Sequence, residues 1–183
     1  MARNAALEHL HPAFRMRALA LEARLAAEGI PLHRYEAART PWRQAELYAR
    51  GRTSGYGEFG KTVTRARAWE SWHQYGLAAD YVFRVDGKWT WAEPEAGMWH
   101  RYQQLAHDLD LQTLSREKPH VQLPARRSDL LAGKFPQGGD DSWEAWLEDQ
   151  IERWGSTARE VAGVLHPGAP PLVSLYERPA EVA

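Results

Sequence analysis

The fold of this chain is decided by residues 71–91, SWHQYGLAADYVFRVDGKWTW. Residues 77–85 are rich in apolar and aromatic side chains, which is typical of a strand. Asp86-Gly87 is a turn signal, and residues 88–91 can return as a second strand. The stretch therefore predicts a β-hairpin with a loop on its N-terminal side.

Apolar residues recur at helical spacing on both sides of this hairpin. In residues 12–28, for example, Phe14, Leu21 and Leu25 share one face, and Gly29 is a natural C-cap. The same reasoning predicts helices at 41–50, 94–109 and 142–154, and short strands at 31–37 and 120–123. Helices mixed with an antiparallel hairpin favour the α+β class, with a small antiparallel sheet packed against helices.

The length of 183 residues suits one ordinary domain with an appendage. Residues 51–70 have no periodicity and are expected to form a long loop, which in compact domains is often functional. The character of the chain changes after Pro124. We therefore divide it into a domain at 1–125 and an extension at 126–183, made of a helix and a proline-rich tail whose role the sequence leaves open.

Composition excludes several kinds of site. The chain has no cysteine, so disulfides, thiolate zinc fingers, iron–sulfur clusters and thiol nucleophiles are ruled out, whereas eight histidines are present. The 23 basic and 24 acidic residues leave a formal charge of −1, which argues against a nucleic-acid partner. The nine tryptophans are unusual. Those between residues 69 and 99 could stack on sugar, although most tryptophans pack in cores.

His73 and Asp80 stand on either side of Gly76, whose backbone freedom allows both side chains to converge on one point. A neutral imidazole and a carboxylate are two of the three ligands that a catalytic zinc takes from a protein. A histidine and an aspartate at this spacing are also common as hydrogen-bonded surface residues, so the pair alone does not define a metal site.

Glu117-Lys118-Pro119-His120 supplies a third candidate ligand. Pro119 favours an extended conformation at Lys118, and we expect a short bend on which Glu117 and His120 face one cavity. The histidine would bind the metal, and the unbound glutamate would take a proton from water. The alternative for Glu117 is a solvated loop charge.

These motifs, SxHxxGxAxD at 71–80 followed by ExPH at 117–120, resemble the zinc metallopeptidases of the D-alanyl-D-alanine carboxypeptidase and L-alanyl-D-glutamate endopeptidase superfamily. That group cleaves the peptide stems of bacterial peptidoglycan. The block RTPWRQAELYARGRT at 39–53 is similar to the family's segment of Arg, Gln, Leu-Tyr and Gly-Arg-Thr. The resemblance covers about residues 8–125. It departs at Ala37-Ala38, where the family often has glycine and an aromatic residue.

The resemblance implies a complete zinc site at the face of the sheet, in a catalytic domain at 1–125. It implies that His73, Asp80 and His120 bind zinc and that Glu117 is the catalytic base. It also implies that Arg39 lies over the substrate carbonyl and that Ser71 and Gln44 bind substrate. Glu117 would pass the proton of the attacking water to the leaving amine.

The block at 39–53 is more similar to the endopeptidase branch, which includes phage endolysins, than to the carboxypeptidase branch. The sequence therefore favours an L-alanyl-D-glutamate endopeptidase that lyses the cell wall. Two alternatives stay open: a D-alanyl-D-alanine carboxypeptidase, and a non-catalytic wall-binding or structural subunit of a phage-like particle. The presence of Glu117 argues against the second.

The expected partner is bacterial peptidoglycan, and the oligomeric state is left open. No stretch approaches the roughly 18 apolar residues of a membrane span. The N-terminal residues lack the apolar region of a signal peptide. We therefore expect synthesis in the cytoplasm, followed by action on the wall after release through a separate membrane-breaching protein or within a phage-like particle.

Overall fold

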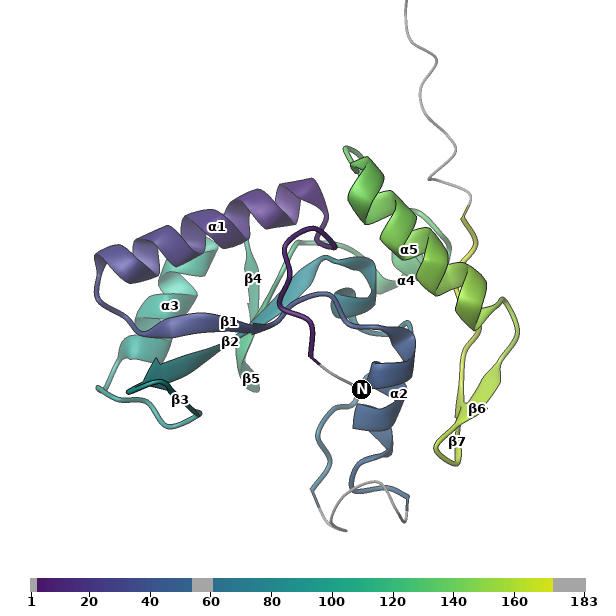
Figure 1. The fold of residues 1–183 in the computed structure, drawn as a ribbon, viewed down its shortest axis with the longest axis horizontal. Helices are drawn as coiled ribbons and strands as arrows, with labels where there is room; N and C mark the ends of the chain where they lie inside the picture. Colours follow the sequence, from purple (N-terminus) through teal and green to yellow (C-terminus); the bar gives the residue numbers. More distant parts are fainter. Residues whose placement is uncertain (1–2, 54–60, 173–183) are drawn as a thin grey trace, which may run out of the picture.

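The computed structural model describes residues 3–53 and 61–172 (Figure 1). Its class is α+β, as predicted, with helices packed against a small antiparallel sheet. In chain order the elements are α1 (Pro12–Ala27), β1 (Leu32–Glu36), α2 (Pro41–Ala49), the 3₁₀ helix η1 (Trp72–Tyr75), β2 (Ala78–Val85), β3 (Lys88–Thr90), α3 (Met98–His107), β4 (Gln112–Leu114), β5 (Glu117–Gln122), α4 (Arg127–Leu131), α5 (Asp141–Trp154), β6 (Arg159–Val161) and β7 (Val164–His166).

The main sheet has the strand order β1-β2-β5-β4, with β3 pairing to β2. Strand β2 is therefore central, and all its pairings are antiparallel. Its first residues meet both neighbours, because Asp80 pairs with Glu36 on one side and with His120 on the other. The sheet thus brings residues that are far apart in sequence to one place near its middle.

The two faces of the sheet have different environments because side chains alternate along a strand. Tyr81 and Phe83 of β2 face the core, where Tyr81 donates a hydrogen bond to Glu22 of α1 and Phe83 contacts the ring of Trp99 on α3. Helices α1 and α3 cover this face (Figure 1). Asp80 points to the opposite face, which the helices leave available for a site.

The C-terminal part packs into the same hydrophobic core as the sheet. The apolar stripe predicted for the last helix is buried on α5, where it comprises Trp143, Leu147, Ile151 and Trp154. Trp143 donates a hydrogen bond of 2.8 Å to the carbonyl of Tyr75, at the end of η1. The division at residue 125 stays a prediction, and residues 173–183 of the predicted tail lie outside the described part.

Differences from the predicted elements concern short segments. Helix α3 begins at Met98 rather than at 94, because Gly97 adopts a φ of 97° that a helix cannot contain. The bend expected at 117–120 lies within β5. Five elements were not predicted from sequence: the 3₁₀ helix η1, strand β4, helix α4 and the two strands β6 and β7. Segments this short lack a hydrophobic period. No helix in the described part has the length and apolar character needed to cross a bilayer.

Candidate metal centre

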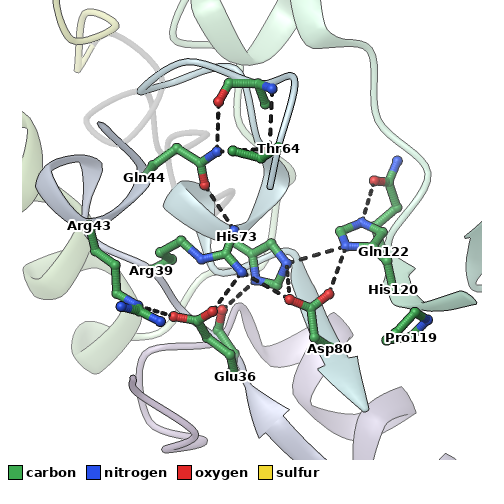
Figure 2. A network of polar contacts seen from close by, with 12 residues as sticks. Glu36, Arg39, Arg43, Gln44, Thr64, His73, Asp80, Pro119, His120 and Gln122 are labelled. Atoms are coloured by element: carbon green, nitrogen blue, oxygen red, sulfur yellow. Dashed lines mark hydrogen bonds and ion pairs between the residues drawn. The ribbon is translucent and has the colours of Figure 1, made fainter. Parts of the chain in front are cut away.

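The three ligands predicted from sequence converge on the open face of the sheet (Figure 2). His73 comes from η1, Asp80 from β2 and His120 from β5. Nε2 of His73 lies 3.2 Å from Nδ1 of His120 and 3.4 Å from Oδ2 of Asp80, and Nδ1 of His120 lies 3.3 Å from Oδ1 of Asp80. One candidate ligand atom from each of the three residues therefore lies within 4.8 Å of the others.

Backbone geometry places His73. Gly76 ends η1 with a φ of 65°, and a Cβ built there would lie 2.4 Å from the carbonyl oxygen of His9. Only glycine meets both conditions, which confirms the turn expected at this position. The Nδ1 of His73 lies 2.6 Å from the carbonyl oxygen of Ala37, so it is the protonated nitrogen and donates this hydrogen bond. Its Nε2 is left to face the centre.

His120 is oriented in the same way by a neighbour on its own strand. Its Nε2 lies 2.9 Å from Oε1 of Gln122 and acts as the donor, which leaves Nδ1 facing Asp80. Acceptors that hold the outer nitrogen of a histidine are common behind metal ligands, because they fix the ring and its tautomer. Gln122 is buried and was not predicted from sequence. The alternation of β5, which puts residues 120 and 122 on one face, was the available signal.

The separations are close to those around a small tetrahedral cation. Ligand atoms at zinc distances of about 2.0–2.1 Å and tetrahedral angles are about 3.3–3.4 Å apart. The two imidazole nitrogens lie 3.2 Å apart, and each lies at a similar distance from its own oxygen of Asp80, Oδ2 at 3.4 Å for His73 and Oδ1 at 3.3 Å for His120. Two imidazole nitrogens and one carboxylate also match the donor set that zinc takes in hydrolytic sites. The residues present therefore fit the metal that the sequence motif implies.

Electrostatics prepare two of the three donors, His73 and Asp80, for a cation. Burial lowers the pKa of His73, and the positive charge of Arg39 acts in the same direction. Burial alone would raise the pKa of Asp80, but His73, His120 and Arg39 hold it well below its ordinary value. For His120, burial acts downward, while hydrogen bonding and the charge of Asp80 outweigh it and raise the pKa. Asp80 is thus an ionised carboxylate and His73 a neutral imidazole at neutral pH.

Arg39 is tied to the centre through a buried ionic network (Figure 2). Its guanidinium donates to Asp80 at 2.9 Å and to Glu36 at 2.7 Å. Glu36 also accepts from Arg43, and both arginines lower its pKa against the upward effect of burial. Sequence reasoning missed Glu36, although its position three residues before Arg39 could have suggested an ion pair. Arg39 thus contacts the same oxygen of Asp80, Oδ2, that faces His73, whereas Oδ1 faces His120.

Gln44 and Ser71 lie at different depths. Gln44 is buried: it accepts hydrogen bonds from Arg39 and Gln74 and donates to the carbonyl of Ala66. A role for Gln44 in substrate binding stays a prediction. Ser71 stands directly before η1 and lines the cavity. It also pairs with Gln74, which accepts from the Ser71 amide at 3.2 Å.

The centre opens into a cavity of about 510 Å³. Glu117 is exposed and lines this cavity together with His120. Residues three apart in a regular strand face opposite sides, but β5 carries a bulge here. Thr113 of β4 pairs with Val121 and the next residue, Leu114, pairs with Glu117. The residues between them have no partner on β4. The bulge is how both side chains of the ExPH motif reach one cavity.

The chain is similar to a peptidoglycan endopeptidase. Over 83 residues it is 42% identical to the peptidoglycan L-alanyl-D-glutamate endopeptidase CwlK of Bacillus subtilis (strain 168). The match covers 45% of this chain and 47% of CwlK, so the chain spans about half the length of this relative. No protein-family profile matches the chain. The identity supports the endopeptidase resemblance that the motifs indicate.

Proposed function

We propose that this protein is a zinc-dependent peptidase that hydrolyses the L-alanyl–D-glutamate bond of the peptidoglycan stem peptide. The observation that carries the proposal is the convergence of His73, Asp80 and His120 at the wall of a cavity that Glu117 also lines. The similarity to CwlK supports this choice of bond. The place of action is then the bacterial cell wall.

His73, Asp80 and His120 would hold the metal through Nε2, a carboxylate oxygen and Nδ1. Zinc in such a site polarises a carbonyl group and acidifies water. Ala37 and Gln122 keep the two imidazoles in the tautomers that this requires. Arg39 donates a hydrogen bond to Asp80 and so keeps the Asp80 carboxylate from rotating away from the two histidines.

Glu117 is the group placed to move protons. Its carboxylate takes a proton from the attacking water as the water oxygen bonds to the scissile carbonyl carbon. When the carbon–nitrogen bond breaks, the same carboxyl delivers that proton to the leaving amine of D-glutamate. Glu117 suits this role because it lines the cavity and is exposed to water and substrate.

Arg39 and Ser71 line the same cavity as the ligands. A guanidinium held beside Asp80 places positive charge where negative charge develops on the substrate carbonyl, and such preorganised charge is a large contribution in acyl transfer. Ser71 would orient the peptide with its hydroxyl. Its position directly before η1 connects it rigidly to His73.

Mass spectrometry of muropeptides tests the function and the bond. Purified peptidoglycan is incubated with the protein, with and without a metal chelator and with zinc added back. We expect new N-terminal D-glutamate, loss of this product with chelator and its return with zinc. Release of free D-alanine would instead assign a carboxypeptidase. Binding to peptidoglycan with no cleavage would assign a non-catalytic subunit.

A further inference from the structure

Three aromatic side chains gather on the same face of the sheet as the metal centre. Tyr35 of β1 meets Trp89 of β3 with ring centroids 5.1 Å apart, and meets Trp91 at 5.4 Å, in both cases edge to face. Trp89 pairs with Arg84 on β2, and positions 80 and 84 of that strand share a face. We call Tyr35, Trp89 and Trp91 the aromatic platform.

The rings of the aromatic platform are exposed, but contacts with neighbouring side chains hold them in place. Trp89 is 42% and Trp91 58% exposed, whereas Trp69, Trp143 and Trp154 are fully buried. The guanidinium of Arg3 lies 3.9 Å from the ring centre of Tyr35, and that of Arg84 lies 5.7 Å from Trp89. Two neighbouring exposed tryptophans held in position are unusual on a surface and are typical of a binding site.

The platform is continuous with the metal cavity. Tyr35 and Trp91 line the cavity of about 510 Å³ that contains His120 and Glu117. Trp91 also lines a neighbouring cavity of about 380 Å³, together with Glu117 and Pro119. A substrate bound at the metal centre would therefore extend onto the platform at one end.

The chemistry of the proposed substrate identifies what lies at that end. In peptidoglycan the L-alanine before the scissile bond is joined directly to the lactyl group of N-acetylmuramic acid. One extended residue spans only about 3.3–3.6 Å, so this sugar must lie next to the catalytic cavity. A pyranose has an apolar C–H face and a rim of oxygen atoms, which suit an aromatic ring and a guanidinium donor respectively.

We propose that Tyr35, Trp89 and Trp91 bind the N-acetylmuramic acid end of the glycan strand and thereby select sugar-linked stems over free peptides. This inference rests on the proposed function, which puts a stem peptide in the cavity. Arg3 and Arg84 then face the hydroxyl and acetamido oxygens of the sugar. The geometry favours glycan over a protein partner because the platform opens into the catalytic cavity.

The test compares two substrates that share an acylated N-terminus and differ in the sugar. One is the stem tetrapeptide acylated with lactic acid, called the free stem below, and the other is the same stem carried on the N-acetylglucosaminyl–N-acetylmuramic acid disaccharide. We expect Trp91→Ala to raise KM for the sugar-linked stem roughly tenfold more than KM for the free stem, about the energy of one aromatic contact. Trp91→Phe, which keeps an aromatic face, should restore most of the difference.

Trp146→Ala is the matched control. This half-buried tryptophan of α5 stacks on His9 and does not line the cavity. The substitution should affect neither substrate selectively. An equal loss on both substrates in Trp91→Ala, or equal KM values for the two substrates in the wild type, would overturn the proposal. So would self-association of the wild type that Trp91→Ala abolishes, since the platform would then be an interface between copies.

A direct binding measurement separates this proposal from the proposed function. Saturation-transfer NMR with the peptide-free disaccharide should show contact in the wild type and its loss in Trp91→Ala. If the wild type cleaves neither substrate, the proposed function fails. Disaccharide binding then tests by itself whether the aromatic platform binds sugar. Absence of disaccharide binding, or binding that survives in Trp91→Ala, would contradict the proposal that the aromatic platform binds the sugar.

Discussion

At the scale of single residues, the proposed metal ligands and the proposed catalytic base differ in their exposure to solvent. Both imidazoles are buried and have fixed tautomers, whereas Glu117 is exposed at the cavity. Binding and catalysis should therefore be lost independently.

We expect Glu117→Ala to retain bound zinc and to lose hydrolysis by about 10²–10⁴-fold, the usual contribution of a positioned general base. His120→Ala should lose both zinc and hydrolysis, because it removes a ligand atom. Zinc content measured by elemental analysis, together with amine release from peptidoglycan, distinguishes the two. Full activity in Glu117→Ala would exclude it as the base.

A second prediction concerns the buried ion pairs behind Asp80. Glu36→Gln leaves Arg39 and Arg43 close together without their shared carboxylate, and we expect a loss of about 3 kcal/mol in the free energy of unfolding. Urea denaturation measures it. Glu28→Gln, which removes the exposed partner of Arg101, is the control and should change stability little. Similar losses of unfolding free energy in Glu36→Gln and Glu28→Gln would show that burial does not strengthen the ion pairs of Glu36.

At the scale of elements, the turn between η1 and β2 sets the position of His73 relative to Asp80. Gly76 has a positive φ, and a Cβ added to it would lie 2.4 Å from the carbonyl oxygen of His9. Any side chain there must push η1 or the N-terminal segment out of place. The same shift would separate the ligand atoms.

Gly76→Ala should therefore weaken zinc binding and lower stability by more than the roughly 1–2 kcal/mol that a left-handed alanine costs by itself. Gly87→Ala in the β2–β3 turn isolates that backbone cost, because its φ is 75° and no atom lies within 4 Å of the added Cβ. Zinc titration and urea denaturation compare the two. Equal losses in both variants would refute the steric argument.

At the scale of the whole molecule, the C-terminal part supports the centre from behind. Trp143 of α5 donates to the carbonyl of Tyr75 and packs edge-on against His11, which caps α1. The hairpin of β6 and β7 holds the segment between the cavity-lining residues Ala66 and Glu70, because Nδ1 of His166 accepts a hydrogen bond from the amide of the buried Ala68. These contacts explain why the last helix buries its apolar stripe.

Trp143→Ala should consequently destabilise the protein by about 3–5 kcal/mol, as expected for a large buried aromatic side chain. Trp89→Ala removes an exposed ring and should cost far less. Thermal and urea unfolding give both values. A small effect of Trp143→Ala would mean that α5 is not part of the cooperative unit.

Much of this architecture follows from local patterns. The helices at α1, α2 and α5 were predicted within about two residues, because apolar spacing and caps are encoded nearby in sequence. The β2–β3 hairpin was predicted from Asp86-Gly87 for the same reason. The strand pairing of β4 with β5 was not, since a strand of three residues is defined by its partner rather than by its own side chains.

The fold class could be predicted from local patterns, and the three candidate ligands from their motifs and the family resemblance that these carry, because residue chemistry and spacing are local properties. How those ligands are held depends on the tertiary structure. The antiparallel register sets Asp80 beside His120, the bulge turns Glu117 into the same cavity, and Glu36 and Gln122 orient the ligands from positions that no motif marks. Orientation depends on distant backbone being brought together, and only the folded chain supplies those contacts.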